Sequence, residues 1–129
     1  MKSSPLNISI IGLGSMGSAL AKALLKSKFE IYIWNRTLSK AKELNHKESN
    51  ICLSPKEAIE NSELIIVCLL NYKVWSEIID SDLKNIDLNG KTIIQLTTGS
   101  VEEVLNHNEW VKKQQGNLLE GAIICFPTQ

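Results

Sequence analysis

The sequence predicts an α/β domain in which one doubly wound parallel sheet is covered by helices on both faces. Three observations predict this class. Short β-rich runs alternate with helical segments along the whole chain, which is the order expected of a parallel sheet. Several of these runs are apolar on both faces, as strands buried between two helix layers are. A glycine-rich turn joins the first run to the first helix. Right-handed crossovers then make the strand order 3-2-1-4-5-6 the simplest arrangement.

Length and charge are consistent with one domain over residues 1–129. The chain has 14 Lys and Arg against 14 Asp and Glu, and 43% of its residues are hydrophobic. A chain of this length buries a core without a metal or disulfide. The balanced charge argues against nucleic-acid binding. The longest apolar run, 64–70, is far shorter than the ~20 residues that span a bilayer. We therefore expect a cytoplasmic protein with neither nucleic acid nor membrane as a partner.

The strands and helices are placed by β-rich runs and by capping signals. Ser54-Pro55 with Glu57, and Ser100 with Glu103, predict two helix starts of the capping-box type. A helix from Ser15 should pack its residues 16, 20, 23 and 24 onto the sheet, and the helix from Ser100 should end near Gln115, with Gly116 taking the left-handed position. Asn89-Gly90 predicts a turn. The expected strands are 8–11, 31–34, 50–53, 64–69, 92–96 and 118–124.

The three cysteines indicate neither a disulfide framework nor a metal site. Cys52, Cys68 and Cys125 are odd in number, widely spaced and without a nearby CxxC or His. We interpret them as reduced, buried, small apolar side chains, and we expect no metal.

The most informative segment is the turn Gly12-Leu13-Gly14-Ser15-Met16-Gly17. It follows the first strand directly and opens a helix, which is the context in which GxGxxG indicates a Rossmann-type dinucleotide site. Gly12 permits the tight turn, Gly14 lets a diphosphate approach the backbone, and Gly17 lets helix and strand pack closely. Free N–H groups near Ser15 and Met16 would bind the anion. A tight connection without a ligand is the alternative.

The end of the second strand favours NADP over NAD. This position reads Asn35-Arg36-Thr37, without the carboxylate that usually binds the ribose of NAD. Arg36 can bind a 2′-phosphate with two N–H groups, Asn35 and Thr37 add neutral hydrogen-bonding groups, and Lys40 raises the positive potential. Alternatively, Thr37 is only a helix cap and Arg36 a solvated charge.

Two further strand ends should face the same ligand, because ligands of parallel sheets lie at the carboxyl ends of the strands. Leu69 and Leu70 are predicted to pack on the adenosine and on the nicotinamide ribose, and Thr97 and Thr98 to hydrogen-bond the nicotinamide end. A core leucine and a simple helix-entry turn are the alternatives.

These segments together resemble the NADP-binding domain of the β-hydroxyacid dehydrogenase and 6-phosphogluconate dehydrogenase superfamily. The stretches 69–72, 95–100 and 119–123 are most similar to the imine reductase branch, which carries Leu-Asp-Tyr, Leu-Thr-Thr-Gly-Thr and Leu-Asp-Gly-Ala-Ile. The resemblance covers residues 8–127. It implies hydride transfer from NADPH to a C=N bond of a small molecule, and dimerisation through C-terminal helices.

The chain departs from the hydroxyacid dehydrogenases at the substrate side. Their Asp-x-Ser-Thr and Asp-Ala-Pro-Val-Ser-Gly-Gly stretches are replaced here by 95–98 and 120–126, which are less suited to a carboxylate. In relatives the catalytic side chain lies on helices after this domain, so no catalytic residue is predicted within 1–129, and the chain alone is expected to be inactive. Apolar residues Ile123, Ile124 and Phe126 are expected to make it self-associate.

Two other functions stay open at this stage. One is a hydroxyacid dehydrogenase domain acting on C–O rather than C=N bonds. The other is a nucleotide-sensing module without catalysis. Neither His46 nor His107 has a neighbour of catalytic type in the sequence. The aromatic residues are expected to serve packing, with a substrate contact as the alternative for Tyr72 alone: Tyr32, Trp34, Tyr72, Trp75 and Trp110.

Overall fold

Within residues 6–44 and 46–121, which the computed structural model describes, six parallel strands form one sheet in the order β3-β2-β1-β4-β5-β6. This confirms the predicted class and strand order. The strands are β1 (Ile8–Ile11), β2 (Ile31–Trp34), β3 (Ser49–Ile51), β4 (Leu64–Val67), β5 (Thr92–Gln95) and β6 (Asn117–Glu120). The helices are α1 (Ser15–Lys26), α2 (Leu38–Lys42), α3 (Pro55–Glu60), α4 (Tyr72–Ile78) with the π-helical continuation η1 (Ile79–Leu83), and α5 (Val101–Lys113).

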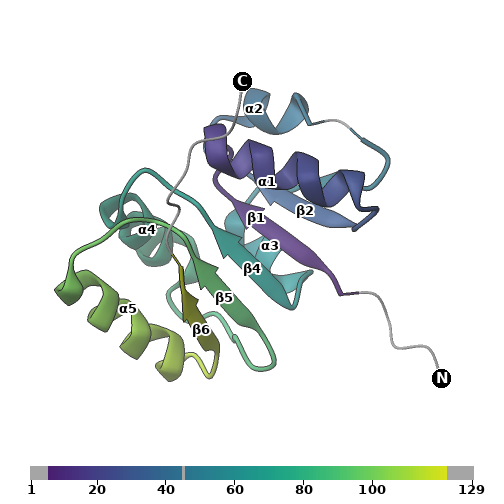
Figure 1. Ribbon diagram of the computed structural model, residues 1–129. Helices are drawn as coiled ribbons and strands as arrows, with labels where there is room; N and C mark the ends of the chain where they lie inside the picture. Colours follow the sequence, from purple (N-terminus) through teal and green to yellow (C-terminus); the bar gives the residue numbers. More distant parts are fainter. Residues whose placement is uncertain (1–5, 45, 122–129) are drawn as a thin grey trace.

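Helices cover both faces of the sheet (Figure 1). On one face α1 and α2 pack on a core that includes Ile10, Ile33 and Ile66. On the other face α3, α4 and α5 enclose a second core that includes Trp75 and Ile93. Because β1 lies between β2 and β4, and all strands run parallel, the segments that follow these three strands meet at one edge of the sheet.

Helix α1 packs with a different stripe from the one predicted. Gly17, Ala21 and Leu25 are its buried residues, whereas Ala23, which was expected to face the sheet, is exposed. Leu20 lies at the margin of the core. The shift of one position follows from Gly17, because its lack of a side chain brings that face of the helix against the turn.

The capping signals predicted the helix starts, with one difference in detail. Ser100 and Glu103 form the complete reciprocal capping box. The Ser54 hydroxyl accepts from the Glu57 N–H, but the Glu57 carboxylate accepts from the N–H of Leu53 rather than from that of the cap residue. Both carboxylates satisfy a backbone donor near a helix start, as the sequence indicates.

The end of α5 corrects the sequence-based assignment by one residue. Gln115, not Gly116, adopts the left-handed conformation, with φ of 68°. Its N–H bonds the carbonyl of Lys112, and the N–H of Gly116 bonds that of Val111, which is the Schellman arrangement. Glycine is needed at 116 for another reason: a Cβ there would lie 2.8 Å from Cβ of Leu88. The turn at Asn89-Gly90 is as predicted, with Gly90 at φ of 77°.

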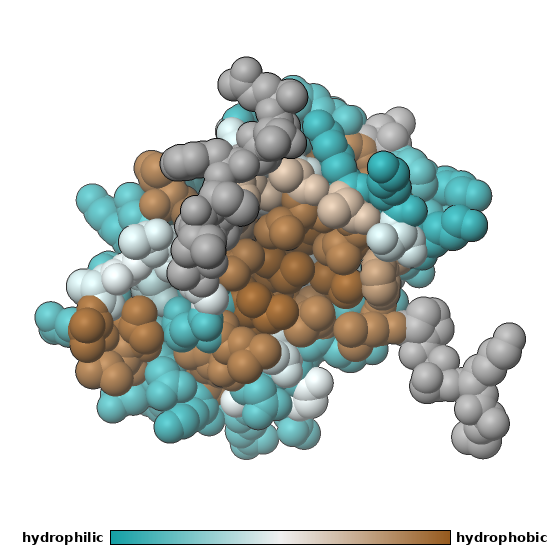
Figure 2. Space-filling model, in the orientation of Figure 1, coloured by the Kyte–Doolittle hydropathy of each residue, from teal (hydrophilic) through white to brown (hydrophobic). Residues whose placement is uncertain are grey.

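One part of the sheet carries apolar side chains that no described helix covers. On the α1 side of β4, β5 and β6 lie Leu64, Ile94, Leu96 and Leu119, and Leu119 is 59% exposed. Figure 2 shows the resulting apolar area beside α1. The predicted patch at 123–126 lies outside the described residues.

Candidate functional site

The turn between β1 and α1 is fixed by hydrogen bonds to the neighbouring strand. The N–H of Gly12 donates to the carbonyl of Trp34 at 3.0 Å. The N–H of Leu13 donates to Oδ1 of Asn35 at 2.9 Å, and the hydroxyl of Ser18 donates to the Leu13 carbonyl at 2.9 Å. The shape of the turn is therefore set by the chain itself, before any ligand binds.

Two glycines of the turn are required by the fold. Gly12 has φ of 101°, a conformation that side chains disfavour, and a Cβ at this position would collide with the carbonyl oxygen of Cys68. A Cβ at Gly17 would collide with the carbonyl oxygen of Gly12. These two residues are explained by packing alone.

Gly14 has no comparable reason within the chain. Its φ is −68°, which any residue adopts, and a Cβ built on it meets no atom within 4 Å. It is also the N-cap of the 12-residue helix α1, whose first turn contains no acidic residue. The space in front of Gly14 is thus open, and it faces N–H groups that lack intrahelical partners at the positive end of the helix dipole. This arrangement suits an anion that lies against the backbone.

Some residues at the end of β2 hold the β1–α1 turn in place, and others have side chains that face solvent. Asn35 uses both ends of its amide within the chain, because Oδ1 accepts from Leu13 and Nδ2 donates to the Thr37 carbonyl. Thr37 is the N-cap of α2, but its side chain makes no capping bond, so its hydroxyl is available to a ligand. Arg36 and Lys40 are exposed, and Nη2 of Arg36 lies 3.4 Å from Oε2 of Glu77 on α4.

The ends of β4 and β5 are joined by a polar link. Oγ1 of Thr97 accepts from the N–H of Leu69 at 3.0 Å, and the N–H of Thr97 donates to Oε1 of the buried Gln95 at 3.1 Å. Leu69 packs against the core, while Leu70 and Thr98 are exposed. Of the four predicted residues, Leu70 and Thr98 therefore present their side chains at this edge, and Thr97 mainly fixes the two strand ends to each other.

A cluster that the sequence did not indicate adjoins this edge, formed by the buried Tyr72 and His107 and by Glu120, whose side chain is 32% exposed. The hydroxyl of Tyr72 donates to the carboxylate of Glu120 at 3.1 Å, and Nδ1 of His107 lies 3.7 Å from the same carboxylate. His107 is only 4% exposed, and this burial lowers its pKa from 6.5 to about 4. Burial likewise raises the pKa of Glu120 and of Tyr72. Gly99 lies under the Tyr72 ring, where a Cβ would collide with it.

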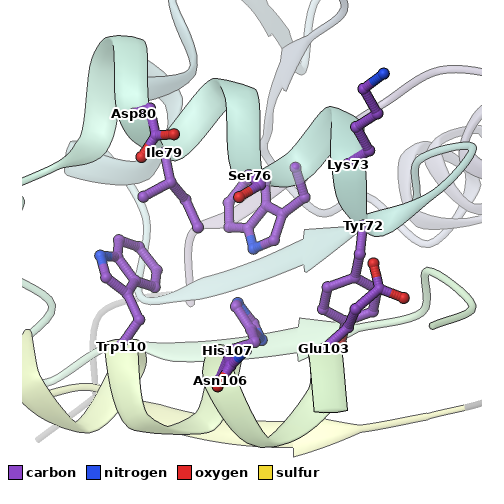
Figure 3. A pocket seen from close by; sticks show the side chains of 10 residues that line it. Tyr72, Lys73, Ser76, Ile79, Asp80, Glu103, Asn106, His107 and Trp110 are labelled. Atoms are coloured by element: carbon purple, nitrogen blue, oxygen red, sulfur yellow. The ribbon is translucent and has the colours of Figure 1, made fainter. Parts of the chain in front are cut away.

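A cavity of about 420 Å³ lies between α4 and α5, on the sheet face opposite α1 (Figure 3). Tyr72, His107 and Trp110 line it, with Asp80 and Glu103 among the charged residues around it. Both ring nitrogens of His107 and Nε1 of Trp110 are enclosed without a hydrogen-bond partner in the described part of the chain. Lys73, Ser76 and Asn106 line the cavity as well, so a molecule in it would meet ring faces together with polar groups of both charge signs. The cavity is separate from the predicted dinucleotide site at the β1–α1 turn.

Two of the three cysteines lie in the described part of the chain, and both thiols are free. Cys52 is buried as predicted, whereas Cys68 is only half-buried. Burial raises the pKa of Cys52 to about 11 and raises that of Cys68. Cys125 lies outside the described residues. Within 6–44 and 46–121, no group of His, Cys, Asp and Glu forms a metal site, and no helix there is both long and apolar enough to cross a bilayer.

Sequence reasoning found the glycine turn and the strand ends, but it missed Ser18, Glu77 and the Tyr72–Glu120–His107 cluster. Ser18 follows the motif directly and its hydroxyl fits a helix start, so its role was readable. Glu77 is separated from Arg36 by 41 positions, and no local pattern connects them.

Comparison with known proteins adds a family and several relatives. Residues 7–123 match the protein family described as the NAD binding domain of 6-phosphogluconate dehydrogenase. The chain is 33% identical, over 122 residues, to an NADPH-dependent reductive aminase of Aspergillus oryzae, covering 95% of this chain and 41% of that protein. It is 34% identical, over 121 residues, to glyoxylate/succinic semialdehyde reductase 1 of Arabidopsis thaliana, covering 92% of this chain and 42% of that protein.

A solved structure shows the same arrangement. The imine reductase from a Pseudomonas species superposes with a TM-score of 0.90 at 31% identity, over 96% of this chain and 43% of that one. The chain thus spans less than half the length of these three proteins.

Proposed function

We propose a function that starts from the family to which this chain belongs, that of the NAD binding domain of 6-phosphogluconate dehydrogenase. The chain is the NADPH-binding domain of an oxidoreductase that reduces C=N bonds. The observation that carries the proposal is Gly14. Its missing side chain serves neither backbone conformation nor packing within the described chain. A ligand that lies against the backbone explains it, and the helix start that it opens suits a diphosphate.

The residues are assigned to three parts of the cofactor. The backbone of the β1–α1 turn would hold the diphosphate, with Gly12, Leu13 and Gly17 shaping the turn and Gly14, Ser15 and Met16 facing the ligand. Arg36, Thr37 and Lys40 would hold the 2′-phosphate, and Asn35 would fix the turn beside them. Leu69, Leu70, Thr97 and Thr98 would border the adenosine and nicotinamide ribose, with Leu70 and Thr98 offering exposed side chains. NADPH, when bound, supplies a hydride from the nicotinamide ring.

The first test replaces Gly14. Serine is a favourable N-cap, so Gly14→Ser should keep or improve helix stability, while its side chain fills the space assigned to the diphosphate. We expect titration calorimetry to show NADPH binding by the wild type and at least tenfold weaker binding by Gly14→Ser at equal melting temperature. Equal NADPH affinity of the two proteins would refute the assignment of the turn.

The second test concerns the preference for NADP. A charge-assisted, two-fold contact of Arg36 with a phosphate is worth about 1–3 kcal/mol. Arg36→Ala should therefore weaken NADPH binding by roughly five- to 150-fold, and NADH binding by little. Equal losses for the two cofactors would remove the argument for NADP.

The choice of a C=N substrate rests on the similarity to the reductive aminase and the imine reductase and on the largely apolar segment 120–126, which stands where the hydroxyacid dehydrogenases have their Ser-Gly-Gly loop. The 34% identity to a glyoxylate/succinic semialdehyde reductase favours C=O reduction as the second candidate. Oxidation of NADPH by the intact protein with a cyclic imine, compared with glyoxylate and succinic semialdehyde, separates the two. Binding of NADPH without turnover of any of them would instead favour a nucleotide-sensing module.

We also propose that the intact protein is a homodimer in the cytoplasm. The uncovered apolar side chains beside α1 support association, because a sheet of this class is covered on both faces in a folded assembly. Sedimentation of the intact protein over a range of concentrations tests the dimer. A monomer at all concentrations would refute it.

A further inference from the structure

The ion pair between Arg36 and Glu77 joins two elements that are distant in sequence. Arg36 follows β2 and Glu77 lies on α4, and Nη2 of the arginine is 3.4 Å from Oε2 of the glutamate. Both side chains are exposed, at 64% and 51%. Helix α4 thus places a carboxylate at the residue that is assigned to the 2′-phosphate, even though the end of β2 itself contains no acid.

A carboxylate and a phosphate both bind to a guanidinium group, here that of Arg36. A guanidinium binds either of them through paired N–H groups. When the 2′-phosphate takes a place on Arg36, it comes close to the charge of Glu77, and two anions near one guanidinium repel each other. No other acidic residue is within ion-pair distance of Arg36 in the described chain.

We propose that Glu77 is a specificity-determining residue that competes with the 2′-phosphate for Arg36, and so weakens NADPH binding selectively and speeds its release. The inference rests on the proposed function. It assigns Glu77 a role opposite to that of Arg36 within the same site. NADH lacks the 2′-phosphate, so Glu77 should leave its affinity nearly unchanged.

The size of the effect follows from the exposure of the pair. Exposed ion pairs contribute little, and their loss, together with relief of the repulsion, corresponds to roughly a three- to fivefold change in affinity. Glu77→Gln keeps the shape of the side chain and removes its charge. It should bind NADPH about three- to fivefold more tightly than the wild type, and the difference should shrink at high salt because both charges are exposed.

The chain provides a matched control. Glu60 forms the exposed Lys56–Glu60 pair on α3, with Nζ–Oε1 of 3.6 Å and a glutamate that is 55% exposed. Glu60→Gln removes the same charge with similar exposure, away from the assigned site. We expect it to bind NADPH as the wild type does.

The experiment is a titration of NADPH and NADH into the wild type, Glu77→Gln, Glu60→Gln, Arg36→Ala and the Arg36→Ala/Glu77→Gln double variant, at low and high salt. In the Arg36→Ala background, Glu77→Gln should raise NADPH affinity by less than it does when Arg36 is present, because only the direct repulsion between the carboxylate and the 2′-phosphate remains there. Stopped-flow displacement of NADPH should show the tightening of Glu77→Gln in a slower release rate.

Three results would overturn the inference while leaving the proposed function in place. The first is weaker NADPH binding by Glu77→Gln, which would make Glu77 a residue that positions Arg36. The second is an equal change in affinity for NADPH and NADH. The third is a gain in NADPH affinity that is undiminished in the Arg36→Ala background. Failure of the wild type to bind NADPH at all would overturn the proposed function and this inference with it.

Discussion

Acidification should destabilise this protein through one histidine. His107 is buried between aromatic rings, and its pKa is lowered from 6.5 to about 4. In the unfolded chain the same imidazole binds a proton near pH 6.5. The unfolded state therefore holds one more proton between pH 6.5 and about 4, and the stability that the neutral His107 provides is lost as the pH falls through this window.

The magnitude follows from the size of the shift. One extra proton in the unfolded state changes the free energy of unfolding by about 1.4 kcal/mol per pH unit. Between pH 6.5 and about 4 the free energy of unfolding therefore falls by about 3 kcal/mol in total. Glu120 acts in the opposite direction, because its raised pKa means that the folded state holds its proton more tightly. The effect of Glu120 on the pH dependence of stability is confined to pH values near and above its ordinary pKa of 4.5.

The assay is urea unfolding followed by tryptophan fluorescence, from pH 7.5 down to pH 4.5, for the wild type, His107→Phe and His46→Gln. His107→Phe keeps an aromatic ring without a titrating group, so its free energy of unfolding should decline less steeply below pH 6.5. His46 is exposed, and His46→Gln serves as the replacement of a histidine outside the cluster of His107. A His107→Phe curve parallel to that of the wild type would refute the reasoning.

Three further changes test the packing and the termini of elements. Gly17→Ala forces a Cβ onto the carbonyl of Gly12 and should lower the free energy of unfolding by about 3 kcal/mol or more; a melting temperature equal to that of the wild type would contradict the role of this glycine. Ser100→Ala removes the capping box of α5 and should lower the free energy of unfolding in urea by about 1 kcal/mol. Ser39 is an exposed residue within α2, so the control Ser39→Ala should change the free energy of unfolding little. Leu119→Lys places a charge in the apolar area beside α1, where Leu119 is 59% exposed, and should reduce self-association in light scattering; unchanged association would show that this face is not the contact.

Much of the fold was predictable because its signals are local. The apolar runs at 64–67 and 92–95 contribute side chains to the cores on both faces of the sheet, and the caps at Ser54 and Ser100 begin helices where the sequence places them. One of the errors is also local in origin. The stripe of α1 was misplaced because the contact of Gly17 with the turn outweighs the apolar side chain of Met16.

The left-handed residue at the end of α5 shows how two uses of glycine become confused. Gly116 was predicted to supply the left-handed conformation, but Gln115 adopts it. The glycine provides room for Leu88, a residue that is distant in sequence and invisible to any capping rule.

The candidate site likewise contains features that neighbouring residues in the sequence indicate and contacts that arise only from the packing of distant helices. The glycine turn was readable because strand, turn and helix are consecutive in the chain. The approach of Glu77 to Arg36, and that of His107 to Glu120, depend on how α4 and α5 cross the sheet. Asn35 lies between these cases: its place at the strand end was foreseen, whereas its use in fixing Leu13 required the structure.

A crystal structure determined with NADPH would show directly whether the β1–α1 turn holds the diphosphate. We expect diphosphate oxygens within hydrogen-bond distance of the backbone N–H groups around Ser15 and Met16, in front of Gly14, with the 2′-phosphate on the guanidinium of Arg36. NADPH bound elsewhere, with the space before Gly14 filled by solvent and Arg36 turned away, would contradict it.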